Sequence, residues 1–173
     1  MNIKSLTFLA LSAFFLYSCD DVSSGDDSKA AEVAVTEERN TESLPAFMLV
    51  DEQGTRRDLA AFRGKKLFVN LWATWCPPCR AEMPSIQKLY NSTDRNRSEF
   101  IMLSLDEDFQ SAKFYRSKES FSFPIYAPAQ NLPELFNVRG IPATFIFDES
   151  GKLIHRRDGS DNYDTDKYRE LLK

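Results

Sequence analysis

The chain has few of the residues on which several classes of protein depend. Among its 173 residues there are one histidine and three cysteines, and no internal repeat is visible. Its formal net charge is −4, and it has no stripe of lysine and arginine with interleaved aromatic residues. Binding to nucleic acid through displaced counterions is therefore not expected. With 42% hydrophobic and 28% charged residues, the composition is typical of one globular domain with a tail.

The first apolar run is too short to cross a bilayer as a stable helix. Residues 1–18 carry one cation, Lys4, and a mainly apolar run from Leu6 to Tyr17. This pattern predicts a signal peptide. It ends in Leu16-Tyr17-Ser18-Cys19, which resembles the bacterial lipobox, although Tyr17 is bulkier than that pattern prefers. The alternative is an ordinary secretory signal with a chance cysteine.

Lipidation of Cys19 would hold the protein at a membrane, because each buried methylene contributes about 0.8 kcal/mol. We therefore expect an extracytoplasmic, membrane-anchored bacterial lipoprotein facing the periplasm, with the choice of membrane left open. Residues 19–43 contain few large apolar side chains and are predicted to form a flexible tether. The folded domain is expected over residues 44–173.

If Cys19 is acylated, the two remaining cysteines are Cys76 and Cys79, spaced C-x-x-C. A zinc site needs four ligands, and His155 is the one histidine available, so no metal is expected. A structural disulfide is the main alternative to a redox-active one. However, a bridge that closes so short a loop removes little entropy from the unfolded chain. Redox chemistry is therefore the better interpretation, with no cofactor besides the disulfide itself.

From Leu44 onward, short apolar runs alternate with helical patterns, which predicts an α/β domain with some parallel pairing. The predicted order begins with a β-hairpin around Phe47–Gly54. Further strands are expected at residues 67–72, 100–105, 141–147 and 152–155, with one more between the second and third helices. Helices are expected at about 76–91, 109–118, 131–136 (with Asn131 as N-cap) and 163–172.

The position of Cys76 at the start of a helix indicates which sulfur reacts. Unpaired N–H groups and the helix dipole favour a thiolate there, whereas Cys79 is expected to be buried one turn later. Pro77 and Pro78 have no N–H, so only the amide of Cys79 can bond the Cys76 sulfur. We expect a mildly lowered pKa for Cys76. Without a basic residue in the loop, a reductant is favoured over an oxidant.

The segment Val69–Pro84, which reads VNLWATWCPPCRAEMP, resembles the active-site segment of TlpA/ResA-like thioredoxins. These are exported or membrane-tethered thiol-disulfide oxidoreductases. The resemblance extends to Pro45–Leu49, Gly64-Lys65 and Gly140–Phe145, and so covers about residues 44–172. It implies a thioredoxin-like fold, in which helices flank a mixed central sheet with an N-terminal β-hairpin.

The resemblance also implies roles for single residues. Cys76 matches the family's nucleophile and Cys79 its resolving thiol. Pro142 matches a cis proline that packs against the disulfide, and Ile141 would present its backbone to an extended substrate. Trp75 and Pro77 are expected to border the same substrate site, with Trp75 shielding the sulfur.

Classical thioredoxins have a buried aspartate six residues before the first cysteine, where this chain has Asn70. An amide cannot exchange a proton. Glu82 lies three residues after Cys79 on the same helical face, and burial should raise its pKa until it accepts the Cys79 proton. The alternative for Glu82 is a solvated helix carboxylate. His155 is expected at the surface rather than as a ligand.

The resulting hypothesis is an oxidoreductase that reduces disulfides in exported proteins through Cys76 and Cys79. The expected partners are protein thiol or disulfide substrates and the membrane, and the chain is expected to be monomeric. The family implies a membrane thiol-reducing donor and raises cytochrome c maturation as a hypothesis.

Three other functions remain as alternatives. A disulfide-donating oxidant would need a helical insertion, for which the stretch between Cys79 and Pro142 is too short. A copper chaperone would need Cys-x-x-x-Cys and a downstream histidine. His155 lies downstream, but the spacing of the cysteines here is Cys-x-x-Cys. A peroxiredoxin would need a Pro-x-x-x-Thr-x-x-Cys loop, and residues 69–76 lack the proline.

Overall fold

The structure is a computed structural model that describes residues 42–173. The predicted signal peptide, Cys19 and most of the predicted tether lie outside these residues. Within them, no helix combines the length and the hydrophobicity that a membrane span requires.

In the described part of the chain, a seven-stranded sheet has the order β2-β1-β5-β4-β3-β6-β7. The three central strands β3, β4 and β5 run parallel, and the other neighbouring pairs are antiparallel. The predicted α/β class, mixed sheet and N-terminal hairpin are thereby confirmed. The strands are β1 (Met48–Asp51), β2 (Arg56–Asp58), β3 (Lys66–Trp72), β4 (Ser98–Ser104), β5 (Ile125–Pro128), β6 (Ala143–Phe147) and β7 (Leu153–Asp158).

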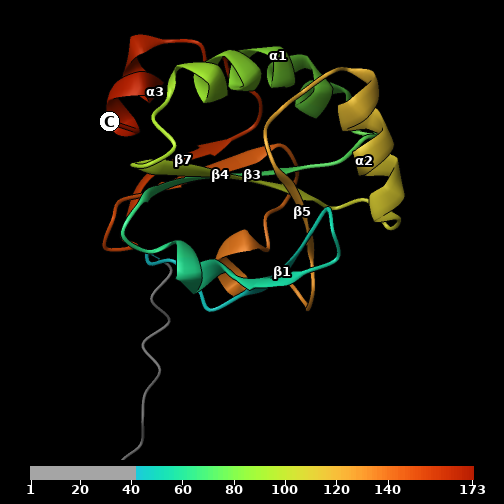
Figure 1. Ribbon diagram of the computed structural model, residues 1–173, viewed down its shortest axis with the longest axis horizontal. Helices are drawn as coiled ribbons and strands as arrows, with labels where there is room; N and C mark the ends of the chain where they lie inside the picture. The colour runs from blue at the N-terminus through green and yellow to red at the C-terminus, as the bar shows by residue number, and fades with distance from the viewer. Residues whose placement is uncertain (1–41) are drawn as a thin grey trace, which may run out of the picture. The chain divides into compact units, whose positions relative to one another are not determined.

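Three α-helices and two short 3-10 helices connect these strands. Figure 1 shows α1 and α3 side by side along one side of the sheet, with α2 next to β5. The helices are α1 (Pro77–Ser92), α2 (Phe109–Lys118), α3 (Asp166–Leu171), η1 (Leu59–Phe62) and η2 (Glu134–Phe136).

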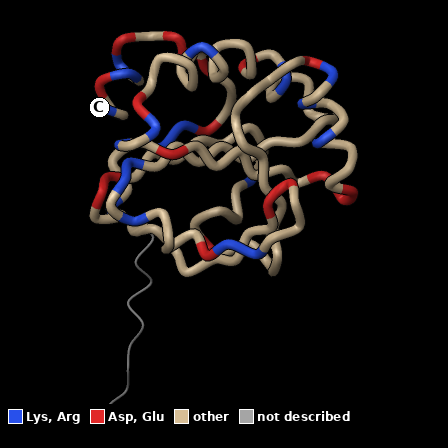
Figure 2. The backbone as a smooth tube through the Cα atoms, viewed as in Figure 1, with Lys and Arg blue, Asp and Glu red and all other residues tan. Residues whose placement is uncertain are grey.

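Strand β3 lies between β4 and β6 and carries the site, because α1 begins a few residues after it ends. All of its residues from Leu67 to Trp72 are buried. Phe68 and Trp72 pack in the core with α1 and α3, whereas Val69 and Leu71 pack in the core on the opposite face. Charged residues gather in the helices, loops and strand ends, and leave the central strands largely uncharged (Figure 2).

Two local predictions are wrong. Asn131 does not cap a helix, because η2 begins at Glu134 after Pro133 and has no side-chain cap. His155 is half-buried on β7 rather than on the surface, because its ring packs edge-on against Tyr168 of α3 with ring centroids 5.6 Å apart. Burial also lowers the pKa of His155.

Candidate active site at the start of helix α1

Cys76 and Cys79 form a disulfide at the N-terminus of α1, with their Cα atoms 5.3 Å apart. Cys76 is the N-cap residue, and the Cys79 N–H donates to its Sγ at 3.3 Å. This is the hydrogen bond predicted from the two prolines between them. Cys79 is fully buried, whereas Cys76 keeps 3% of its surface exposed. Of the two residues, Cys76 is therefore the one that a reacting partner can approach.

The loop that precedes β6 lies against this sulfur. The Ile141–Pro142 peptide bond is cis, as predicted. The Ile141 carbonyl oxygen lies 3.6 Å from Cys76 Sγ. The sulfur carries no proton in the disulfide, so this is a packing contact in the oxidised protein. The Gly159 N–H donates to the Pro142 carbonyl at 2.9 Å and fixes the far side of the loop.

Asp106 ties the strand-to-helix turn to the end of β4. It accepts hydrogen bonds from the Thr74 N–H at 3.1 Å and the Thr74 hydroxyl at 2.6 Å. It also accepts one from the Ser104 hydroxyl at 2.8 Å. Sequence reasoning missed this contact. The parallel register could have found it, because Trp72 pairs with Ser104 and the residues two positions later then meet.

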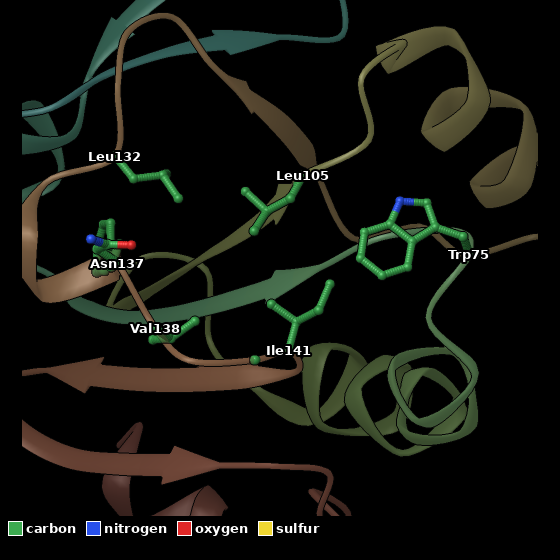
Figure 3. Close-up of a pocket in the computed structure, with 8 residues that line it drawn as sticks. Trp75, Leu105, Leu132, Asn137, Val138 and Ile141 are labelled. Carbon is green, nitrogen blue, oxygen red and sulfur yellow. The ribbon is translucent and has the colours of Figure 1, made fainter.

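An apolar pocket of about 430 Å³ opens beside the disulfide. In Figure 3, the side chains of Trp75, Leu105 and Ile141 converge on it from three different segments. Trp75 is 66% exposed and forms part of the rim. Pro77 is exposed at the first position of α1 and does not line the pocket. The lining residues that sequence reasoning missed are Leu105, Leu132, Phe136, Asn137, Val138 and Gly140.

Glu82 lies one turn after Cys79 and is only 3% exposed, so it is not a solvated carboxylate. Its Oε1 accepts a hydrogen bond from Asn70 Nδ2 at 2.8 Å, and its Oε2 accepts one from the Asp161 N–H at 3.3 Å. Burial raises the pKa of Glu82 to about 7, although both hydrogen bonds act in the opposite direction. The group therefore titrates near neutral pH.

A family model described as Redoxin matches residues 39–172. The chain belongs to the Redoxin family. This Redoxin protein is 32% identical over 112 residues to the thiol-disulfide oxidoreductase ResA of Geobacillus kaustophilus, which covers 64% of each chain. The chain thus spans less than two thirds of that relative's length. It is 29% identical over 137 residues to ResA of Halalkalibacterium halodurans, which covers 78% of each chain.

Solved structures agree with the fold of this Redoxin protein. A thiol:disulfide interchange protein of the thioredoxin family from Chlorobium tepidum superposes with a TM-score of 0.66 and 27% identity, over 76% of this chain and 95% of that one. These relatives place the chain among the ResA/TlpA-like thioredoxins and confirm the thioredoxin-like fold.

Proposed function

We propose that this protein is a thiol-disulfide oxidoreductase that reduces disulfides in other proteins. The observation that carries the proposal is the Cys76–Cys79 disulfide at the N-terminus of α1, beside an apolar pocket and with a buried carboxyl group one turn later. The relatives named thiol-disulfide oxidoreductase support it.

In the first step, the thiolate of reduced Cys76 attacks one sulfur of a substrate disulfide. A bond forms between these two sulfurs, and the second substrate sulfur leaves as a thiolate that takes up a proton. The helix N-terminus and the N–H of Cys79 favour the attacking thiolate, because both place positive partial charge beside Cys76 Sγ. An extended substrate that runs along Ile141 would bring its sulfur to Cys76.

In the second step, Cys79 attacks Cys76 and restores the disulfide seen in the structure, and the substrate leaves with both cysteines reduced. Two electrons have then passed from the dithiol to the substrate. Cys79 must lose its proton before it attacks, and it lies where no solvent reaches it. Glu82 has a pKa of about 7, so at neutral pH a large share of it is ionised and ready to accept that proton.

We expect the reduction potential of the Cys76–Cys79 pair to be near or below about −270 mV. The loop between the cysteines carries no basic residue, so the thiolate gains only the helix terminus and one N–H. Equilibration of the protein with dithiothreitol or glutathione buffers measures the value. A potential near about −120 mV would instead make the protein a disulfide donor.

The apolar pocket is expected to bind side chains of the substrate protein. We expect Val138→Asp to lower kcat/KM for a protein disulfide about tenfold, because a carboxylate in the pocket opposes the burial of an apolar side chain. Exchange with dithiothreitol, which is too small to need the pocket, should keep its wild-type rate. Ile154→Asp is the matched control, since Ile154 is an exposed apolar residue of β7 outside the pocket. Equal losses in both variants would contradict a role for the pocket.

We further propose that the protein works outside the cytoplasm as a monomer, anchored through a lipid on Cys19. A reductant in an oxidising compartment must be reduced again after each turnover, so a thiol-reducing donor in the membrane is part of the proposal. Precursors of c-type cytochromes are the substrate class to examine first. Mass spectrometry of the mature N-terminus tests the anchor, because an acylated cysteine there is required.

A further inference from the structure

Asn70 occupies the buried contact between the sheet and helix α1. Its side chain is fully buried on the central strand β3. Its Nδ2 donates to Glu82 Oε1 at 2.8 Å and to Thr144 Oγ1 at 2.9 Å, which uses both protons of the amide nitrogen. Asn70 therefore connects the carboxyl group of α1 to strand β6.

Thr144 holds the other end of this connection. It lies directly opposite Asn70 in the β3–β6 pair, and its side chain is fully buried. Its hydroxyl oxygen lies 2.6 Å from the Tyr163 hydroxyl oxygen, in the segment that precedes α3. Asn70 Oδ1 is buried and has no hydrogen-bond partner among the described residues. The amide is thus held through its nitrogen alone, by Thr144 on one side and Glu82 on the other.

The two oxygens of Glu82 have different surroundings. Oε1 faces Asn70 inside the protein. Oε2 faces the Asp161 N–H in the segment between β7 and α3, where the neighbouring Ser160 and Asn162 are exposed. Each oxygen accepts one N–H, but the hydrogen bond to Oε1 is shorter, at 2.8 Å, than the one to Oε2, at 3.3 Å. A proton on the carboxyl group is therefore best accommodated on the more weakly bonded Oε2.

Other titratable groups around Glu82 come from each packed element. Asp161 raises its pKa and Arg157 of β7 lowers it, both through charge. Tyr163 and Tyr168 are neutral near pH 7, because burial raises the pKa of both hydroxyls. On α1 itself, the disulfide carries no charge. Asn70 is therefore an uncharged group in direct contact with the carboxyl group, and it acts through its hydrogen bond.

We propose that Asn70 and Thr144 are positioning residues for proton transfer between Cys79 and Glu82. They hold Oε1 as an acceptor, so that Oε2 takes up the proton when the Cys79 S–H bond breaks and later releases it beside the exposed segment 159–162. No electron moves in this step. The inference rests on the proposed function, in which Glu82 accepts the Cys79 proton. An aspartate at position 70 would instead place two carboxyl groups in hydrogen-bond contact, where they would share one proton.

The test is the pH dependence of the second step, measured in the full chain as release of the reduced substrate from the mixed disulfide. Asn70→Leu removes an N–H donor to the carboxylate, so we expect the midpoint of the rate profile to move up by about one pH unit. The rate should fall several-fold at pH 6.5 and recover above pH 8.5. Thr144→Val should move the midpoint in the same direction, and Thr144→Ser, which keeps the hydroxyl, should preserve the wild-type midpoint.

The Glu82→Gln background separates positioning from a purely structural role. There, Asn70→Leu should leave the pH profile of this step unchanged, because the titrating group is gone. If Glu82→Gln alone keeps the wild-type profile, the role of Glu82 in the proposed function is wrong. If Glu82→Gln abolishes the pH step while Asn70→Leu and Thr144→Val keep the wild-type midpoint, the positioning role is overturned. If Asn70→Leu does not fold, the two Thr144 variants test the proposal. A midpoint that moves up in Thr144→Val but not in Thr144→Ser supports the positioning role, and a wild-type midpoint in both overturns it.

Discussion

Replacing Cys79 with serine is expected to trap the protein as a mixed disulfide with its substrates and to reduce turnover by a factor of about a thousand or more. Cys76 still attacks, because its thiolate is stabilised by the start of α1. A serine hydroxyl at position 79 cannot displace the substrate sulfur. Non-reducing gels and mass spectrometry would show a covalent adduct that dithiothreitol releases.

Cys76→Ser is the matched control, because it leaves the buried thiol of Cys79 in place. We expect no adduct from this variant and no turnover, since substrate cannot reach a fully buried sulfur. An adduct from Cys76→Ser and none from Cys79→Ser would reverse the two roles. That result would require the turn at the start of α1 to open before the reaction, because Cys79 is fully buried and its N–H is bonded to Cys76 Sγ.

The features closest to the disulfide could be predicted because they are local. The apolar run of β3, the proline at the first position of α1 and the absence of an N–H at Pro77 and Pro78 are all visible in one short segment. They led to a helix start within one residue of the observed one. They also led to the hydrogen bond from the Cys79 N–H to Cys76.

The features that sequence reasoning missed depend on contacts between distant segments. Thr74 and Asp106 are 32 residues apart, and they meet because β3 and β4 are parallel neighbours. Glu82 and Asp161 are 79 residues apart, and they meet because the chain returns beside α1 before α3 begins. Burial of Glu82 followed from its helical face, but no local pattern shows which groups surround it.

Asn70 illustrates the same limit within one residue. Its position and residue type showed that a proton-exchanging aspartate is replaced by an amide. The sequence did not show that this amide donates to Glu82, because that contact requires the side chain of β3 to face α1 at the level of the second helical turn. Asn70 and Glu82 therefore form one hydrogen-bonded pair, and only the fold brings the two side chains together.

Replacing Glu82 with glutamine is expected to remove a loss of stability that the wild-type protein undergoes as pH rises. The pKa of Glu82 is raised from an unfolded value of 4.5 to about 7 in the folded protein. Its contribution to stability is therefore fully present below about pH 4.5, and it is lost as pH rises through about 7. Between these values the unfolded chain has released the proton that the folded chain still holds. At about 1.4 kcal/mol per pH unit, the loss is about 3 kcal/mol.

Urea unfolding of the oxidised protein at a series of pH values measures this change. The free energy of unfolding of the wild type should fall between pH 4.5 and 7, whereas that of Glu82→Gln should be flatter and higher above pH 7. The gain in the free energy of unfolding caused by Glu82→Gln should stay below about 3 kcal/mol, because one oxygen becomes an NH₂ group that cannot accept the Asp161 N–H.

Glu107→Gln, at an exposed position, is the control and should follow the wild type. Equal slopes in wild type and Glu82→Gln would contradict titration of Glu82 in this range. A more stable variant with a slower second step would show that the buried carboxyl group serves proton transfer at a cost in stability.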